Sequence, residues 1–260
     1  MNARSDESDL THRVRTYWNA RIHDLEMTDK PPGSKAFFAE LDEYRFDKLA
    51  YLPRVIDFGG FRGQRLLEIG CGIGTDLVRF ARGGAVVAGI DLSETAIRLA
   101  RRNLEVNGLP CDRFAVADGS RLPLADASVE VVYAHGVLQY SADPHGIVAE
   151  AHRVLRPGGK AVFMVYNRIS WLMAMSKVSK VPLEHQDAPG LRMYSIPEFQ
   201  AMLKGFRTVE IVPERFPVKS RLHHGWKGAL FNTFFVGGFN LLPRAAVRRF
   251  GWHLMAICER

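Results

Sequence analysis

The chain has 260 residues and a net charge of +7, with 47% hydrophobic and 24% charged residues. This composition excludes a disordered or fibrous protein and is typical of a globular protein with a buried core. Three scattered cysteines are too few for a disulfide framework or a thiolate metal site. The polar N-terminus does not resemble a secretory signal, and no apolar run is long enough to span a membrane, so we expect a cytoplasmic protein.

The positive charge is concentrated in the last part of the chain. Residues 201–260 contain ten basic and three acidic residues, which is the whole surplus, and the rest of the chain is balanced. Uniform coating of a nucleic acid is therefore not expected. One interpretation is a local anionic partner, such as a phosphate-bearing substrate or a lipid surface, and the other is a solvated basic face.

From about residue 65, apolar runs of strand length alternate with amphipathic helical stretches. This pattern predicts an α/β fold, in which helices cover both faces of a mostly parallel sheet. Ser93, Asp143 and Ser195 stand where helices are expected to begin, as N-caps. The expected strands are residues 65–70, 85–91, 114–118, 129–134, 161–166, 208–212 and 253–258.

Three segments decorate this alternating pattern: residues 1–62, 167–194 and 218–250. We expect 1–62 to be an N-terminal helical arm or lid, and 63–260 to be one domain that carries the other two segments as insertions. The apolar run 229–242 has two interpretations. One is a lid that covers an apolar substrate with an anionic group, or that contacts a membrane surface. The other is a helix packed on the core with a solvated basic rim. The basic residues around it are Lys219, Arg221, Lys227, Arg244, Arg248 and Arg249.

The most specific motif runs from Glu68 to Gly74, where the first expected strand turns into a helix. Glycines at 70, 72 and 74 allow a tight turn and a close approach of the backbone to a ligand. Asp91, at the end of the second strand, can accept hydrogen bonds from both hydroxyls of a ribose. A dinucleotide fingerprint would need a third glycine where Thr75 stands, so the motif predicts a nucleoside without a pyrophosphate.

The pattern Glu-x-Gly-x-Gly-x-Gly resembles motif I of the class I, Rossmann-like methyltransferases that depend on S-adenosylmethionine (SAM). Further similar motifs follow in order at Asp91, 117–119, 131–135 and 155–160, so the resemblance covers roughly residues 64–167. It implies a seven-stranded, mostly parallel sheet with an antiparallel last strand, SAM as cofactor, S-adenosylhomocysteine (SAH) as product, and no metal. The implied cofactor-binding residues are Tyr17, Glu68, Gly70, Cys71, Gly72, Gly74, Asp91, Leu92, Asp118, Gly119 and His135.

Within that superfamily, Leu122-Pro123-Leu124, residues 136–140 and the turn 156–159 are most similar to the ubiquinone- and menaquinone-biosynthesis type. Many of those relatives carry a His pair after strand four, where this chain has Gln139-Tyr140, so neither a quinone substrate nor a His base transfers by position. Residues 15–19 resemble the arm that folds over the cofactor, or else form an aromatic pair packed on the core.

A general base, where the acceptor needs one, is expected from the side of the sheet that faces the ligand. His135 and Tyr140 are favoured as catalytic residues because they follow strand four, at the carboxyl ends of the strands. The full set of candidates is His135, Tyr140, His145, Tyr166, His185, His223 and His224.

These features predict a SAM-dependent methyltransferase that acts on a small, apolar metabolite through an oxygen, carbon or nitrogen atom. The alternatives are a SAM-binding sensor without catalysis, an RNA methyltransferase, and a nicotinamide-dependent oxidoreductase. The sequence leaves the acceptor and the oligomeric state open.

Overall fold

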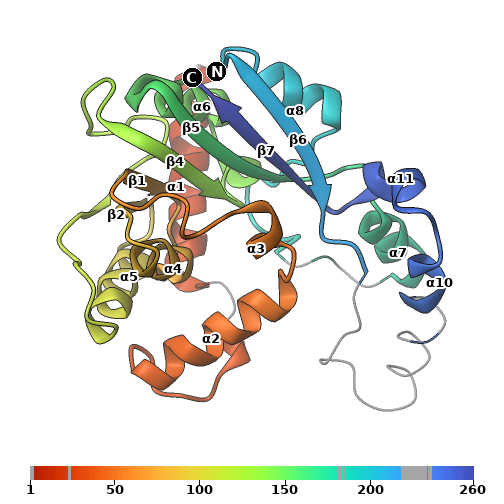
Figure 1. Ribbon diagram of the computed structural model, residues 1–260, viewed down its shortest axis with the longest axis horizontal. Coiled ribbons are helices and arrows are strands. Elements are labelled where there is room, and N and C mark those ends of the chain that lie inside the picture. The colour runs from red at the N-terminus through yellow and green to blue at the C-terminus, as the bar shows by residue number, and fades with distance from the viewer. Residues whose placement is uncertain (1–2, 23–24, 181–182, 184, 218–232, 234–235) are drawn as a thin grey trace.

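The computed structural model describes residues 3–22, 25–180, 183, 185–217, 233 and 236–260. Its seven strands form one sheet in the order β3-β2-β1-β4-β5-β7-β6 (Figure 1). β1 to β5 pair in parallel, and β7 runs antiparallel to both β5 and β6. The predicted α/β sheet with an antiparallel last strand is therefore confirmed. The strands are β1 (Arg65–Ile69), β2 (Val86–Asp91), β3 (Phe114–Val116), β4 (Val129–His135), β5 (Leu155–Tyr166), β6 (Thr208–Glu214) and β7 (His253–Glu259).

Helices cover both faces of the sheet, which is why its strands are apolar on both sides. In Figure 1, α6 (Pro144–Val154) and α8 (Ile196–Met202) lie above the sheet, and α4 (Thr75–Arg82) and α5 (Glu94–Val106) lie below it. The neighbouring side chains of Leu66 and Leu67 belong to separate core clusters, one on each face. Both are at most 1% exposed.

The predicted helix starts are confirmed by their capping bonds. Ser93 accepts from the backbone N–H of Ala96 at 3.1 Å, and Asp143 accepts from Gly146 at 2.7 Å. Ser195 forms a capping box with Glu198. Each cap satisfies a backbone donor that the first turn of a helix leaves without a partner.

The largest boundary difference from the prediction is at the start of the fifth strand. We expected this strand to begin at residue 161, but α6 ends at Val154 and β5 begins at Leu155. The pairing with β4 shifts register between Val129 and Val131, so the turn 156–159 is an irregularity inside β5. A positive φ of 76° at Gly158 is the conformation that such a bulge requires.

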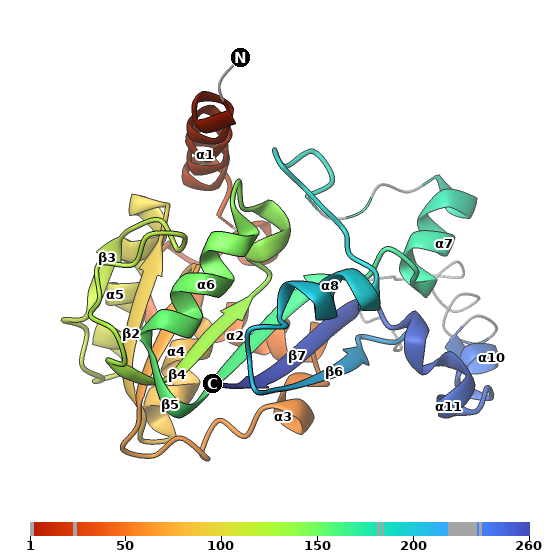
Figure 2. The same ribbon diagram turned by 90° about the horizontal axis from the view of Figure 1, so that it is seen from above.

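The N-terminal segment is helical, as predicted, and contains α1 (Ala3–Ala20), η1 (Leu25–Met27), α2 (Lys35–Lys48) and α3 (Leu52–Val55). α1 stands at one edge of the sheet (Figure 2). It is tied there because Asn19 Oδ1 accepts a hydrogen bond of 2.8 Å from Ser93 Oγ, at the start of α5. A division into an arm and a separate domain stays a prediction.

The decorations of the second half gather beside β6 and β7. α7 (Trp171–Ser179), α10 (Gly237–Asn240) and α11 (Arg244–Val247) lie near one another in both views (Figures 1 and 2). The predicted lid residues Lys219, Arg221 and Lys227, and residues 229–232 and 234–235 of the apolar run, lie outside the described residues. Of the helices that the structure describes, none is both long and apolar enough to cross a bilayer.

Candidate functional site

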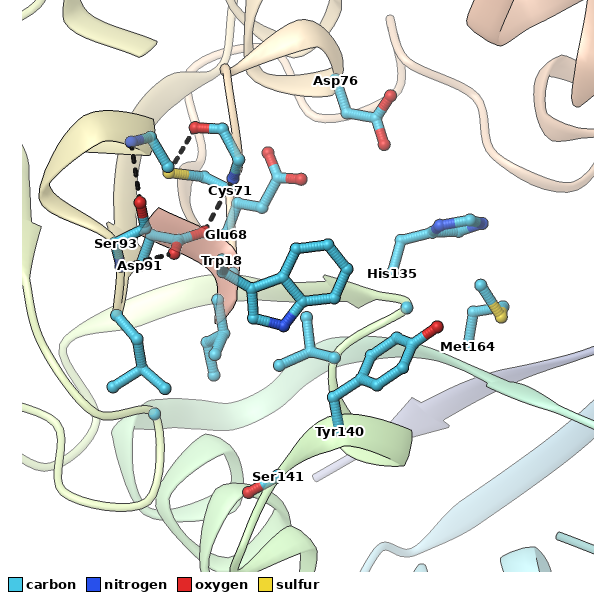
Figure 3. A pocket seen from close by; sticks show the side chains of 18 of the residues that line it. Trp18, Glu68, Cys71, Asp76, Asp91, Ser93, His135, Tyr140, Ser141 and Met164 are labelled. Atoms are coloured by element: carbon cyan, nitrogen blue, oxygen red, sulfur yellow. Dashed lines mark hydrogen bonds between the residues drawn. The ribbon is translucent and has the colours of Figure 1, made fainter. Parts of the chain in front are cut away.

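A cavity of about 230 Å³ opens where β1, β2 and β4 end, at the point where the strand order reverses. Charged residues divide its lining into two parts. We name the part with Glu68, Asp91 and Asp118 the carboxylate end, and the part with Arg45, Lys48 and Arg215 the cationic end. Figure 3 shows Asp91 and Ser93 on one side of the cavity and His135 on the other, with Glu68 and Trp18 between them.

The glycine loop after β1 shapes the carboxylate end. Gly70 and Gly72 have φ of 67° and 53°, values that residues with a Cβ rarely adopt. A Cβ on Gly70 would lie 2.4 Å from Val137 Cγ2, whereas a Cβ on Gly72 would meet no atom within 4 Å. The loop therefore leaves room beside Gly72 for a ligand that approaches the backbone closely.

Asp91 is held in position by two backbone donors. The N–H of Gly72 donates to its Oδ2 at 2.9 Å, and the N–H of Ser93 donates to its Oδ1 at 2.8 Å. Burial raises the pKa of Asp91, and these two N–H groups act in the opposite direction. Because each carboxylate oxygen has two lone pairs, Asp91 can still accept hydrogen bonds from a ligand.

Glu68 contributes a buried carboxylate oxygen to the middle of the cavity. The residue is 4% exposed, and its Oε2 has no hydrogen-bond partner among the described residues. Burial, followed by the negative charge of Asp76, raises the pKa of Glu68 well above its ordinary value. An isolated buried carboxylate is costly, so this oxygen favours a ligand that brings a hydrogen-bond donor or a positive charge.

Most of the predicted site residues lie together around this cavity. Those that line it are Glu68, Gly70, Cys71, Gly72, Asp91, Leu92, Asp118, Gly119, His135 and Tyr140. Their roles toward a cofactor or acceptor stay predictions. Burial raises the pKa of Cys71 well above its ordinary value, so its thiol is not a ready nucleophile.

Two predicted residues, Tyr17 and Gly74, do not line the cavity. Gly74 caps α4 with a φ of 74°, and a Cβ there would lie 3.2 Å from Ala100 of α5, so this glycine serves helix packing. Tyr17 donates a hydrogen bond of 3.0 Å to Asp187. The neighbouring Trp18 faces the cavity instead, because Thr11, Val14 and Trp18 share one face of α1.

The cationic end begins on α2, where Leu41, Arg45 and Lys48 share one face toward the cavity. Arg45 binds Asp76 through Nε at 2.7 Å and Nη2 at 2.5 Å, and Tyr133 donates to Asp76 Oδ2 at 3.0 Å. Burial opposes the charge of Asp76, but Arg45 outweighs it and holds the pKa of Asp76 below its ordinary value. Sequence analysis missed Arg45 because an arginine on an amphipathic helix usually lies in solvent.

A chain of hydrogen bonds continues from the cationic end to β4. Arg215 Nη1 lies 3.0 Å from His253 Nε2, Tyr51 Oη lies 2.6 Å from His253 Nδ1, and Tyr51 Oη lies 3.1 Å from His135 Nε2. A guanidinium can only donate, so His253 accepts at Nε2 and donates from Nδ1 to Tyr51.

Both imidazoles in this chain are neutral near pH 7. Burial and the charge of Arg45 lower the pKa of His135 to about 3, and burial and Arg215 lower the pKa of His253 well below its ordinary value. Sequence analysis missed His253 and Tyr51. The first position of β7 beside β5 was a usable signal for His253, since that position lies next to the end of β5.

Only some of the other candidates for a general base line the cavity. Tyr166 and His185 line the cavity, His145 does not, and His223 and His224 lie outside the described residues. Tyr140 packs edge-on against Trp18, with ring centroids 5.2 Å apart. The catalytic roles of His135 and Tyr140 stay predictions. Over the described ranges, no three His, Cys, Asp or Glu side chains form a group that could hold a metal ion.

The strand order, the antiparallel β7, the glycine loop after β1 and the acid after β2 together define the class I, Rossmann-like methyltransferase fold. Sequence comparison agrees, because residues 67–163 match the family described as "Methyltransferase domain". Over residues 67–163 the chain is therefore similar to methyltransferase domains.

Two curated proteins are similar in sequence to part of this chain. Over 118 residues the chain is 34% identical to ubiquinone biosynthesis O-methyltransferase from Idiomarina loihiensis, covering 45% of this chain and 49% of that protein. It is 43% identical over 103 residues to an uncharacterized 37.1 kDa protein in transposon TN4556 of Streptomyces fradiae, covering 38% of this chain and 29% of that protein. The chain thus spans about half or less of the curated relatives it matches.

Among solved structures, geranyl diphosphate C-methyltransferase from Streptomyces coelicolor A3(2) is similar in fold. The TM-score is 0.59 at 17% sequence identity, covering 96% of this chain and 97% of that chain. At this identity the likeness shows the fold alone. It covers nearly the whole chain, whereas the sequence matches cover less than half of it.

Proposed function

We propose that the protein transfers a methyl group from SAM to a small-molecule acceptor. The observation that carries the proposal is the cavity itself, which joins the glycine loop and Asp91 at one end to His135 at the other. The domain family and the fold support the same conclusion.

The residues at the carboxylate end fit the parts of SAM. Asp91 would bind the ribose hydroxyls, and Asp118 with Gly119 would contact the adenine. Glu68 Oε2, which is buried and has no partner among the described residues, would accept from the α-ammonium group of the methionyl part. The open space beside Gly72 would take the same methionyl part.

The acceptor would lie against an aromatic wall. Trp18, Tyr140, Met164 and Tyr166 line the same cavity as His135. Such a wall favours a small molecule with an apolar body, because burying that body releases water from the side chains. α1 places Trp18 over the cavity and so excludes water from the reacting groups.

Bound SAM supplies an electrophilic methyl group on a positively charged sulfur. A lone pair of the acceptor forms the new bond to the methyl carbon while the electron pair of the carbon–sulfur bond leaves with the sulfur. The cavity's task is to hold the acceptor in line with that bond. A proton on the acceptor atom, where there is one, leaves to water or to Tyr140. The acceptor atom stays open between oxygen, nitrogen and carbon.

Calorimetric titration with SAH tests the cofactor part of the proposal. We expect one site per chain, and we expect Asp91→Ala to weaken SAH binding by about 10- to 100-fold, since it removes a charged hydrogen-bond acceptor. Asp112→Ala removes an exposed carboxylate outside the cavity and is the matched control. Folded wild-type protein that takes up no SAH would overturn the proposal.

Turnover is tested with methyl-labelled SAM and a panel of phenols, carboxylic acids, amines and quinols. We expect label in at least one small product, with SAH released in equal amount. Binding of SAH combined with no labelled product in the panel or in a small-molecule cell extract would favour a SAM sensor instead.

A further inference from the structure

Three positively charged side chains from distant parts of the chain line the cationic end. They are Arg45 and Lys48 on α2, and Arg215 directly after β6. Their convergence on one part of the cavity wall is a property of the tertiary structure, because these two elements are not neighbours in the sequence.

The guanidinium of Arg45 contacts two groups. Its Nε and Nη2 donate to Asp76, and Nη2 also lies 3.5 Å from His135 Nδ1, to which a guanidinium can only donate. Among the described residues Nη1 makes no hydrogen bond, so this nitrogen can donate to a ligand in the cavity.

Arg215 is held with a strained backbone. Its φ of 56° lies in the left-handed region, which costs energy for any residue with a Cβ. Surrounding structure maintains it, since Trp171 Nε1 donates to the carbonyl of Arg215 at 2.8 Å while the guanidinium reaches His253 at 3.0 Å. Strain of this kind is commonly kept where a side chain must be aimed at a ligand.

The described carboxylates near the cavity are arranged by end. Glu68, Asp91 and Asp118 serve the carboxylate end, and Asp76 is bound by Arg45. Glu214, the neighbour of Arg215, does not line the cavity and lies 3.7 Å from Arg54. The described part of the wall therefore carries acidic groups, of which Asp76 is paired with Arg45, and the cations Arg45, Lys48 and Arg215.

We propose that the acceptor presents an anionic oxygen group, a carboxylate or a phosphate, to the donors Arg45, Lys48 and Arg215. This inference rests on the proposed function, and it adds the chemical class of the acceptor. The group binds by charge-assisted hydrogen bonds, while the aromatic wall holds the rest of the molecule. The same donors stabilise the acceptor's negative charge in a cavity that excludes water.

The test measures binding of three matched probes to SAH-loaded protein. Benzoate and phenyl phosphate carry the two anionic groups, and benzyl alcohol is their neutral counterpart. We expect at least one anion to bind about tenfold or more tightly than the alcohol, and its affinity to fall as salt is added. The stronger of the two anions tells a carboxylate acceptor from a phosphate acceptor.

Matched variants assign the effect to the cavity. Lys48→Met and Arg215→Gln should each lower the affinity for the preferred anion about tenfold, while the affinity for SAH stays unchanged. Lys35→Met, an exposed position on the same helix α2, and Arg248→Gln, an exposed position outside the cavity, should change nothing.

Three outcomes would overturn the inference while SAH still binds. The alcohol could bind as tightly as the anions, neither anion could bind at millimolar concentration, or Lys35→Met could weaken the anion as much as Lys48→Met. Loss of SAH binding in the wild type is a separate result, because it overturns the proposed function.

Discussion

The two ends of the cavity bury charge in opposite ways. At the carboxylate end, Glu68 keeps an oxygen without a partner among the described residues, and its pKa is raised well above the ordinary value. At the cationic end, Asp76 is equally buried, but two hydrogen bonds from Arg45 hold its pKa below the ordinary value. The hydrogen-bond partners of a buried acid thus indicate whether it stabilises the fold or binds a ligand.

Because of this difference, we expect Asp76 to affect the stability of the fold and Glu68 to affect the binding of a ligand. The Arg45–Asp76 pair is complete within the protein, so we expect its loss to affect folding. Glu68 is incomplete within the described protein, so we expect its loss to affect ligand affinity. The predictions that follow test this division in order of decreasing effect.

Arg45→Met should produce the largest change. It leaves Asp76 buried without its counter-charge, and breaking a buried pair in this way costs about 3–5 kcal/mol. The measurement is the free energy of unfolding in urea. Arg102→Met is the control, because its partner Glu105 and Arg102 itself are 60% and 50% exposed, and an exposed pair contributes about 1 kcal/mol or less. Equal losses in the two variants would contradict the assignment of Arg45 to the framework.

Glu68→Gln should leave stability nearly unchanged and weaken SAH by about 10- to 100-fold, the value of a charged hydrogen bond. Because the pKa of Glu68 is raised in the free protein, a bound ammonium group should favour its ionised form and release a proton. Calorimetry in buffers of different ionisation enthalpy measures that proton.

The control for Glu68 is Glu105→Gln on the surface of α5, which should keep both the affinity and the proton release of the wild type. A Glu68→Gln variant that still releases the proton would place the titrating group elsewhere. Asp91, whose pKa is also raised, would then be the first group to examine.

The same division explains what the sequence alone could predict. Nearly all residues that line the carboxylate end are among those that the sequence singled out, because they lie at or just after the ends of β1, β2 and β3 and their spacing is fixed by local backbone geometry. Gly74 and Tyr17 do not line the cavity, and Trp18 lines it in place of Tyr17, which is a helix rotation of one residue. Such a rotation is set by packing, here by the bond between Asn19 and Ser93.

Of the residues around the cationic end, only His135 was predicted, because the others are separated from the motifs by long stretches of chain. Arg45 and Arg215 come close to His135 and His253 only when β7 inserts between β5 and β6 and α2 packs beside the cavity. A lone arginine carries no local signal for such a position. The surplus of basic residues after residue 200 drew attention to Arg248 and Arg249 instead.

The two histidines of the hydrogen-bond chain should give stability a pH dependence of intermediate size. Their folded pKa values lie below the unfolded value near 6.5, so the unfolded state binds more protons below that pH. Stability is therefore lost as pH falls from about 6.5, by up to about 1.4 kcal/mol per pH unit for each histidine. The measurement compares the wild type with a His135→Gln, His253→Gln double variant.

The wild type must be compared with the double variant because Glu68 and Asp91 change the stability of the protein with pH in the opposite direction. Their raised pKa values make the folded state lose stability as pH rises above about 4, and they are present in both proteins. The difference in unfolding free energy between pH 7 and pH 5 then isolates the histidines. Parallel curves for the two proteins would mean that these imidazoles are not held neutral.

The smallest effect is expected from Arg248→Glu combined with Arg249→Glu. Both side chains are exposed, and they line a separate shallow groove with Ile196, Ile211 and Pro213 rather than the cavity. Affinity for the preferred anion, benzoate or phenyl phosphate, should change less than about twofold, and stability by no more than about 0.5 kcal/mol. A loss as large as that of Lys48→Met would show that the basic segment after residue 200 also contacts the acceptor, and the cationic end would then extend beyond Arg45, Lys48 and Arg215.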